Sequence, residues 1–311
     1  MDFLLLIVGL TGLWWGTELT IRGAVSVARR LGLSEFVVGV AILSVGSDLP
    51  ELTIAVDAGL RRLAGTETSD LVVGAALGSC LGQIGLVLGI AGLLAPLSLP
   101  RRTVLLHGGV MLVSLVALAL VGLDGYVTRS EGALLLAAYG GYFWLMLTDG
   151  DSYEPADEDA DLTALHAWVL VGIGLAIVGV GAEFTVLGAI GVAEALGVAQ
   201  AIVAIFLIGV GSSLPELSIS IGAILQRRAT LSVGNLIGSN IFDALIPAGA
   251  AALIAGIHFD AKLLRFDLVA LAVVSVVVVA VLARSRGVRR PEAVVVLALY
   301  TAYLVARLVE S

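Results

Sequence analysis

Two short stretches place a carboxylate beside a helix-breaking proline inside sequence that is otherwise apolar. They are "GSDLPELTI", residues 46–54, and "GSSLPELSI", residues 211–219. Glu51 and Glu216 occupy equivalent places in the two stretches, and neither stretch contains Lys or Arg. An ionisable side chain within an apolar span is costly unless it has a partner, so it is read as functional by default. The simplest counter-charge here is a mobile cation.

The prolines and glycines of the same stretches predict breaks in the backbone. Inside a helix, Pro50 would remove one amide donor and clash with the carbonyl of Gly46, and Pro215 would do the same to Gly211. At membrane depth, irregular backbone is tolerated only where it is buried in protein or lines a water-filled cavity. A bound cation would give the released carbonyl oxygens a partner.

The composition is that of a polytopic membrane protein. Of the 311 residues, 59% are hydrophobic and 14% are charged, and the mean hydropathy is +1.08. In soluble domains about 45–50% of the residues are apolar and about 25% are charged. The apolar runs are continuous and reach the ~20 residues that cross a bilayer as a helix, without the alternation of a membrane strand. The first run lacks signal-peptide features, so we count it as a span. The sequence predicts an all-α membrane protein with ten transmembrane helices, at about 3–28, 35–60, 70–95, 103–122, 131–148, 164–192, 198–225, 231–256, 265–283 and 291–309.

Cysteine and histidine chemistry is excluded by number and spacing. Cys80 is the only cysteine, and His107, His166 and His258 lie in separate segments. The sequence has no CxxC pair, no Cys/His cluster, no HExxH and no Ser/His arrangement, so a zinc site, a haem site and an intramembrane enzyme are disfavoured. We expect no cofactor and no nucleic acid, and as partners membrane lipid and small inorganic cations.

The chain also contains an internal duplication. With a shift of 165 residues, "TELTIRGAVSVARRLG" aligns with "AEFTVLGAIGVAEALG"; after a longer loop in the first half, a shift of 160 aligns "GAALGSC" with "GNLIGSN". Because each half holds five helices, the second must cross the membrane in the opposite direction, which gives a pseudo-two-fold axis in the membrane plane and a site near the midplane. The predicted divisions are a first five-helix repeat (1–148), an acidic connecting loop (149–162) and a second, inverted five-helix repeat (163–311).

The basic residues predict the orientation. With the N-terminus outside, ten Arg fall in cytoplasmic loops, against six basic residues in external ones. The positive-inside rule therefore places both termini outside.

The segments after each motif add oxygen donors. Ser79 and Gln83 follow the first, and Ser239, Asn240 and Asp243 follow the second. Carboxylate, hydroxyl and carbonyl oxygens suit Ca²⁺ and also Na⁺, whereas softer metals prefer Cys or His. The same segments carry glycines that predict close helix packing: Gly74, Gly78, Gly82, Gly85, Gly89, Gly234 and Gly238.

These motifs resemble the alpha repeats of the cation/calcium exchanger superfamily, most closely its prokaryotic sodium/calcium exchanger-like members. That family has a "GTSLPE"-like motif in the second and seventh helices and "GNxxGSN" in the third and eighth. Here "GSSLPE" and "GNLIGSN" are close matches, while "GSDLPE" and "GAALGSC" are looser. The resemblance covers nearly the whole chain, with four motifs in the proper order, and implies a multi-pass protein of a prokaryotic cell membrane.

The resemblance also implies roles for individual residues. Glu51 and Glu216 would be central ligands shared in turn by Ca²⁺ and Na⁺. The remaining implied ligands are the motif side chains Ser47, Asp48, Ser212 and Ser213, the hydroxyls of Ser79 and Ser239, the central pair Gln83 and Asp243, and the backbone carbonyls of Ser44 and Gly209.

Three positions depart from the family pattern. Asp48 replaces a neutral hydroxyl, Cys80 replaces the motif asparagine, and Gln83 is longer than the expected Asn. Asp48 raises the number of central carboxylates to four, which cannot all ionise at low cost in one apolar cavity. We therefore expect one or more of them to hold a proton when few cations are bound.

The function that follows is Na⁺/Ca²⁺ antiport by alternating access, with the first and sixth helices moving, by family analogy, over the other eight. Two alternatives stay open. A divalent cation/H⁺ antiporter on the same fold is favoured by Asp48, and a passive cation channel would need no exchange partner.

Overall fold

The computed structural model describes residues 1–97, 99–148, 162–196, 211, 213–285 and 287–310. The chain divides into two compact units: unit 1 is Met1–Ser47 with Asp151–Leu236, and unit 2 is Asp48–Gly150 with Ile237–Ser311. Each unit draws on both halves of the sequence. The boundaries of the predicted repeats are therefore not the boundaries of the compact units.

Unit 1 is helical over the part that the structure describes. It contains α1 (Asp2–Leu31), α2 (Glu35–Val38), the π-helical segment η1 (Gly39–Leu43), α3 (Ser44–Ser47), α9 (Ala164–Ala195), α11 (Leu214–Leu225) and the first part of α12 (Ala229–Ala255).

The turn between α1 and α2 follows from its residues. Gly32 ends α1 in the left-handed conformation, with φ 64°, and the Leu33 N–H donates to the Ala28 carbonyl at 2.9 Å. Glycine adopts this conformation without steric cost, which explains its place at the helix end. Ser34 then caps α2, because its hydroxyl oxygen accepts from the Val37 N–H at 3.1 Å.

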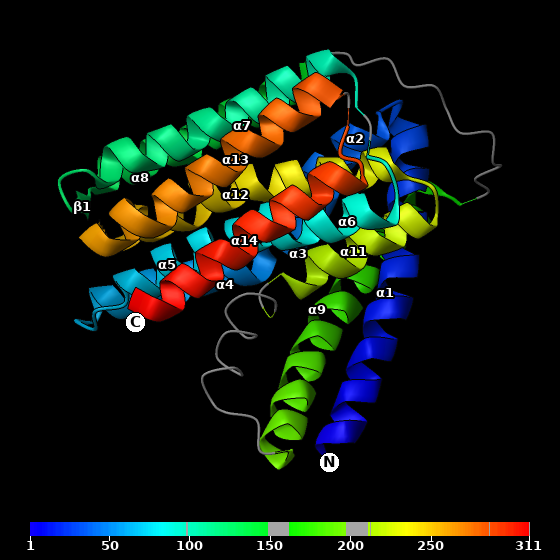
Figure 1. The fold of residues 1–311 in the computed structure, drawn as a ribbon, viewed down its shortest axis with the longest axis horizontal. Helices are drawn as coiled ribbons and strands as arrows, with labels where there is room; N and C mark the ends of the chain where they lie inside the picture. Colours follow the sequence, from blue (N-terminus) through cyan, green and yellow to red (C-terminus); the bar gives the residue numbers. More distant parts are fainter. Residues whose placement is uncertain (98, 149–161, 197–210, 212, 286, 311) are drawn as a thin grey trace. The chain divides into compact units, whose positions relative to one another are not determined.

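Helices α1 and α9 lie side by side and run in opposite directions (Figure 1). Their contact is made by glycines, since a Cβ at Gly16 would lie 2.8 Å from the Gly174 carbonyl oxygen, and one at Gly9 would lie 2.8 Å from that of Gly181. Small residues allow this approach of helix backbones in membranes. We call this line of contacts the glycine seam.

The contacts of the glycine seam are related by the internal repeat. Gly16 and Gly181 are equivalent at the shift of 165 residues, as are Gly9 and Gly174, so the two contacts above are copies of each other. When residue i of one copy contacts residue j of the other, and residue j of the first copy contacts residue i of the second, a two-fold axis relates the two elements. The α1–α9 pair therefore has the local two-fold relation that an inverted repeat requires.

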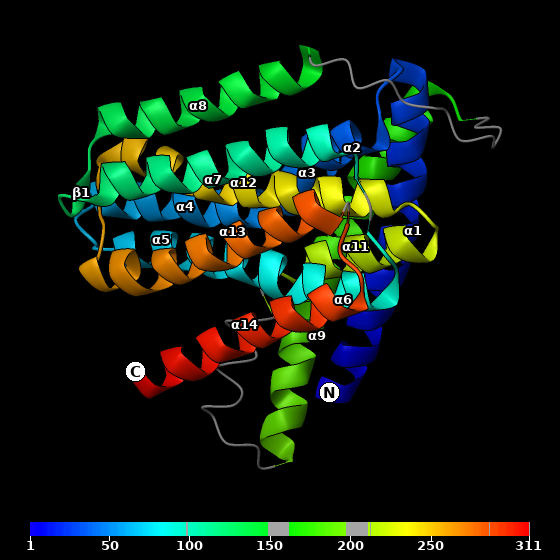
Figure 2. The same cartoon turned by 45° about the horizontal axis from the view of Figure 1, so that its top comes forward.

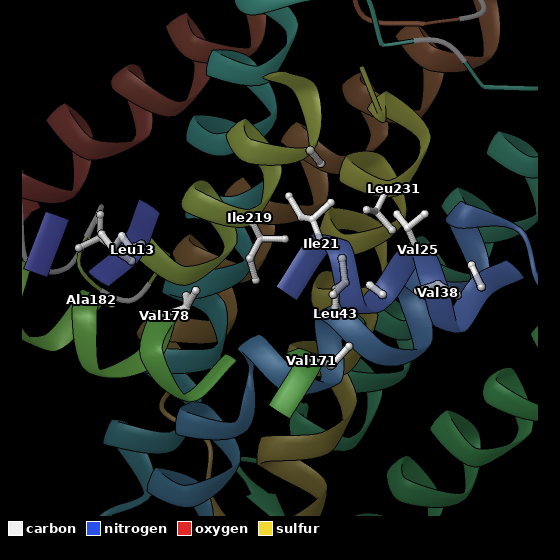
Figure 3. Close-up of a cluster of buried hydrophobic side chains, with 14 residues drawn as sticks. Leu13, Ile21, Val25, Val38, Leu43, Val171, Val178, Ala182, Ile219 and Leu231 are labelled. Carbon is white, nitrogen blue, oxygen red and sulfur yellow. The ribbon is translucent and has the colours of Figure 1, made fainter. Parts of the chain in front are cut away.

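An apolar core supports the seam within unit 1. Figure 3 shows Leu13, Val178, Ile219 and their neighbours gathered from α1, α9 and α11. Ile219 is fully buried, and Leu13 and Val178 are nearly so. These helices are thus fixed to one another by packing as well as by sequence position.

Unit 2 holds the remaining helices and a small antiparallel ribbon. It contains α4 (Leu49–Leu63), α5 (Ser69–Leu81), π-helical η2 (Gly82–Val87), α6 (Leu88–Leu94), α7 (Arg101–Gly122), β1 (Tyr126–Val127), α8 (Arg129–Thr148), the rest of α12, β2 (Ile257–His258), π-helical η4 (Leu263–Asp267), α13 (Leu268–Ser285) and α14 (Arg290–Glu310). Strands β1 and β2 pair with Tyr126 opposite His258. This ribbon, which ties two loops together, is an addition to the expected all-α fold.

The observed helices follow the predicted spans. Within the described ranges, six helices are long and apolar enough to cross a membrane, and Glu35–Ser47 with Leu49–Leu63 makes a seventh if taken as one broken span. The six membrane-crossing helices are Asp2–Leu31, Ser69–Leu94, Arg101–Gly122, Ala164–Ala195, Ala229–Ala255 and Leu263–Arg284. Part of the predicted seventh span, residues 198–210, lies outside the described residues.

Candidate ion-binding site

The acidic motifs each begin a new helix. Asp48 directly precedes α4, with φ −89° and ψ 6°, and Ser213 precedes α11, with φ −97° and ψ 10°. Their carbonyls accept the first helical bonds, from Leu52 N–H at 3.2 Å and Leu217 N–H at 2.9 Å. Two helices related by the repeat therefore start in the same way.

The interruption predicted for the first motif is present, but its position is different. The motif predicts that Pro50 breaks a running helix, whereas the helix stops at Ser47 and restarts at Leu49. Pro50 then lies in the first turn of α4, where its missing N–H would have had no helical partner. Proline here starts the second half-helix instead of distorting the first.

Glu51 and Glu216 are the third residues of their helices and are buried. The first turn of a helix carries partial positive charge from its amide groups, which favours a carboxylate there. Glu51 belongs to unit 2 and Glu216 to unit 1. In each unit the fold holds one motif glutamate at the same place in a helix.

Three acidic side chains of unit 2 lie around Cys80, at the C-terminal end of α5. The carboxylates of Asp48, Glu51 and Asp243 are all close enough to the Cys80 thiol to interact with it electrostatically. Asp48 and Asp243 also act in this way on the hydroxyl of Tyr139. Asp48 and Asp243 are fully buried and Glu51 nearly so. This acidic cluster, Asp48, Glu51 and Asp243, thus contains side chains from the start of α4 and from α12.

Gln83 connects the acidic cluster to its neighbours through every polar atom of its amide. The Gln83 nitrogen donates to Ser79 Oγ and to Asp243 Oδ2, each at 3.0 Å, and its oxygen accepts from Asn240 Nδ2 at 3.0 Å. The nitrogen has no further proton, whereas the oxygen keeps a second lone pair. Gln83 therefore clamps η2 to α12 and still has one acceptor position for a cation.

One of these bonds, and a contact beside it, join residues to their own repeat equivalents. Gln83 pairs with Asp243, and the Cys80 thiol lies 3.6 Å from the Asn240 carbonyl oxygen, both at a separation of 160 residues. Only residues near a two-fold axis can contact their own equivalents. The contact between η2, α5 and α12 therefore marks a local two-fold axis in unit 2, beside the acidic cluster.

Replacing Gln83 with methionine should destabilise the protein by roughly 3 kcal/mol or more, because three buried groups each lose a partner worth about 1–3 kcal/mol. The free energy of unfolding can be measured by titration with sodium dodecyl sulfate. Ile84→Met is the matched control, because this neighbouring swap changes shape but no hydrogen bond and should cost less than about 1.5 kcal/mol. Equal losses of unfolding free energy in the two variants would contradict the role of Gln83 in holding η2 against α12.

The serines that precede the break use the helix backbone. The Ser44 hydroxyl donates to the Val40 carbonyl, and the Ser47 hydroxyl donates to the Ser44 carbonyl at 3.3 Å. The Ser44 carbonyl keeps a second lone pair, so its predicted role as a backbone ligand is compatible with this bond. Both serines follow η1, and π-helical turns often occur at functional sites.

The structure adds three polar side chains that sequence reasoning did not assign, Ser220, Ser232 and Asn235. They are fully buried and keep side-chain atoms without a hydrogen-bond partner among the described residues, as do the predicted ligands Ser213 and Ser239. Buried polar atoms of this kind call for water, an ion or a ligand. Two signals were present in the sequence: Ser220 lies one helical turn after Glu216, and Asn235 belongs to "GNLIGSN".

The predicted ligands divide between the units. Ser44, Ser47, Ser213 and Glu216 lie in unit 1; Asp48, Glu51, Ser79, Gln83, Ser239 and Asp243 lie in unit 2; Gly209 and Ser212 lie outside the described residues. No three Asp, Glu, His or Cys side chains of the described part are placed to hold a metal ion by themselves. A cation here would need hydroxyl, amide and backbone oxygens as well.

Comparison with known proteins identifies the family. The sequence matches the sodium/calcium exchanger protein family over residues 1–148 and 166–309. It is 33% identical over 265 residues to a relative from Alkalimonas amylolytica that bears the antiporter name CaxA, covering 82% of this chain and 81% of that one. It is 25% identical over 348 residues to the sodium/calcium exchanger MaX1 of Methanosarcina acetivorans, covering 98% of each chain.

The fold is that of a solved exchanger. The sodium-calcium exchanger NCX_Mj, soaked with Na⁺ and Sr²⁺, matches with a TM-score of 0.82 and 27% identity, covering 98% of this chain and 97% of that chain. This confirms the prediction of an all-α membrane protein with ten transmembrane helices in inverted repeats. Because the family consists of transporters, the prediction that the chain is not an enzyme is also confirmed. The chain belongs to the sodium/calcium exchanger protein family of membrane cation antiporters.

Proposed function

We propose that this antiporter exchanges Na⁺ for Ca²⁺ by alternating access at a midplane site of oxygen ligands. The observation that carries the proposal is the burial of Glu51 and Glu216 at the same first-turn position of repeat-related helices, with no Lys or Arg in either motif. Buried carboxylates need a counter-charge. The transported cations are the natural source.

The donor set supports these cations. The acidic cluster, the free lone pair of Gln83 and the hydroxyl of Ser239 offer only oxygen atoms in unit 2. Ser213 and Glu216 add further oxygens in unit 1. Oxygen ligands in number suit Ca²⁺, which takes six to eight of them. MaX1 and NCX_Mj, by name, are sodium/calcium exchangers.

Exchange follows if the two ions compete. Na⁺ and Ca²⁺ cannot both occupy the same carboxylates, so binding of one displaces the other. An empty site with several unneutralised charges should resist passage between the two open states, which prevents leak. We place the moving part at α1 and α9, which the glycine seam holds together as one pair.

A gradient experiment tests the proposal. In proteoliposomes of the full chain, ⁴⁵Ca²⁺ uptake is expected when Na⁺ is loaded inside and diluted outside, and not when K⁺ replaces Na⁺. Uptake driven by a pH gradient alone would replace the proposal with divalent cation/H⁺ antiport. Uptake that needs no counter-ion would indicate a channel.

Asp48 is the residue that favours the H⁺ alternative, because it adds a buried carboxylate to the acidic cluster. We expect Asp48→Ser to change the ratio of Na⁺ to Ca²⁺ or the response of uptake to an imposed pH gradient. An unchanged ion ratio together with an unchanged pH response would remove any special role for Asp48. Wild-type vesicles measured in parallel provide the reference.

A further inference from the structure

A small cavity lies in unit 2 where α6 ends and α14 begins. Its volume is about 380 Å³, and its walls include Leu93, Leu94, Pro96 and Pro291. Figure 2 shows the end of α6 beside the start of α14. The acidic cluster does not contribute to its lining. The cavity is therefore separate from the candidate ion-binding residues of this unit.

Two guanidinium groups complete the lining of this cavity. Arg290 Nε donates to the Leu93 carbonyl at 3.3 Å, which holds the side chain at the end of α6. Arg289 also lines the cavity, and its backbone N–H is occupied by the Glu292 carboxylate at 3.1 Å. Both Arg residues are exposed, and neither forms an ion pair with a described residue. Guanidinium groups have five donors in a planar fork, so Arg290 retains four for another acceptor.

The surrounding loops place this cavity at one end of the membrane helices. Leu97 and Val288 exchange backbone hydrogen bonds of 2.9 and 2.7 Å, which joins the α6–α7 loop to the α13–α14 loop. Four helix ends thus meet at the same boundary. Arg101 and Arg284 lie exposed on the same loops and helix ends. An accumulation of Arg at one boundary is typical of the cytoplasmic side.

We propose that this cavity binds the phosphate headgroup of an anionic phospholipid from the cytoplasmic leaflet. Arg289 and Arg290 would hold the phosphate in charge-assisted hydrogen bonds, for which the guanidinium fork is suited. Leu94 and the two prolines would contact the glycerol and the upper acyl chain. Basic pockets between membrane helices on the cytoplasmic side bind lipid headgroups of this kind. A free phosphate ion would gain nothing from the apolar walls, so we commit to the lipid.

Native mass spectrometry of the full chain tests the site. The protein is titrated in detergent with phosphatidylglycerol or with phosphatidylcholine of the same acyl chains. We expect phosphatidylglycerol to bind preferentially. The double variant Arg289→Gln/Arg290→Gln should weaken that binding on the order of 10- to 30-fold, because each Arg that is removed costs about tenfold or less in affinity. The matched control is Arg129→Gln/Arg265→Gln, which removes two exposed Arg from α8 and η4 of the same unit, outside the cavity. It should bind like the wild type.

Two further arms distinguish a lipid in the cavity from a free phosphate ion and from a general effect of surface charge. Ala95→Trp fills the cavity without changing charge and should also weaken phosphatidylglycerol binding, whereas millimolar inorganic phosphate should not displace the lipid. Equal binding by the pocket and control variants, or equal binding of the two lipids, would overturn the site. Displacement by phosphate would overturn the choice of a lipid. Thermal melting of each variant verifies that it is folded.

Discussion

Glu51→Gln and Glu216→Gln are each expected to reduce Na⁺-driven ⁴⁵Ca²⁺ uptake to the background of empty vesicles. Each change removes one negative charge and preserves the size of a buried side chain at the start of its helix. Loss of even an outer-shell partner of a metal ligand costs about 10- to 100-fold in affinity or activity, so loss of a direct ligand should exceed about 100-fold. Initial rates of uptake under an imposed Na⁺ gradient measure the effect.

Glu131→Gln provides the matched control for these variants. Glu131 is also the third residue of its helix, α8, but its carboxylate caps the Thr128 N–H at 2.8 Å outside the candidate site. Glutamine can replace glutamate in such a capping box, so transport should stay near the wild-type rate. Full activity in Glu51→Gln or Glu216→Gln protein would remove the basis of the proposed function. Loss in all three variants would point to a general effect of the substitution.

Gly181→Val should disrupt the pairing of α1 with α9. A Cβ at Gly181 would lie 2.8 Å from the Leu13 nitrogen and 3.0 Å from the Gly9 carbonyl oxygen, and backbone atoms cannot move aside as side chains do. Overpacking of this kind costs about 1–3 kcal/mol for added methyl groups, and occasionally more. We expect a lower free energy of unfolding in sodium dodecyl sulfate and a large loss of transport.

The same helix supplies the control for this substitution. Gly179 has nothing within 4 Å of the position that a Cβ would take, so Gly179→Val introduces the same β-branched residue into α9 without a steric conflict. The difference between the two variants isolates the contact. Equal stability and transport in Gly181→Val and Gly179→Val would contradict the close approach of the helices at the glycine seam.

The repeat adds a second requirement. Gly16 is the equivalent of Gly181, and its Cβ would meet the Gly174 carbonyl oxygen at 2.8 Å. Because the contacts of the seam are related by a two-fold axis, Gly16→Val should cost about as much as Gly181→Val. A large effect of one change with no effect of the other would contradict the symmetric pairing.

The sequence by itself determined the class of protein and its internal plan. Continuous apolar runs and the odd number of helices in each half are local or counting properties, so they identify membrane helices and an inverted repeat without any knowledge of packing. The same is true of the acidic motifs, because a carboxylate without a basic neighbour in an apolar span is visible in the sequence itself. The ligand roles came from the family resemblance and remain predictions.

Tertiary structure decided how the donors are used and where the backbone is interrupted. The sequence indicates that Gln83 has oxygen and nitrogen atoms to offer, but only the approach of α12 shows that Asp243 and Asn240 take two of its three bonds, the third being local, to Ser79. Likewise, Pro50 can either break a helix or begin one, and the structure places it in the first turn of α4. The exact partners of a polar side chain depend on residues 160 positions away, which no local pattern contains.

The glycines show the same division. Spacing predicted close packing for all of them, yet Gly74 and Gly78 have nothing within 4 Å of a Cβ position, whereas Gly85 and Gly89 meet Tyr300 and Leu297 of α14 at 2.7 and 2.5 Å. Small residues only permit two helices to approach. Which glycines are used depends on where the neighbouring helix lies, and that is a property of the packed fold alone.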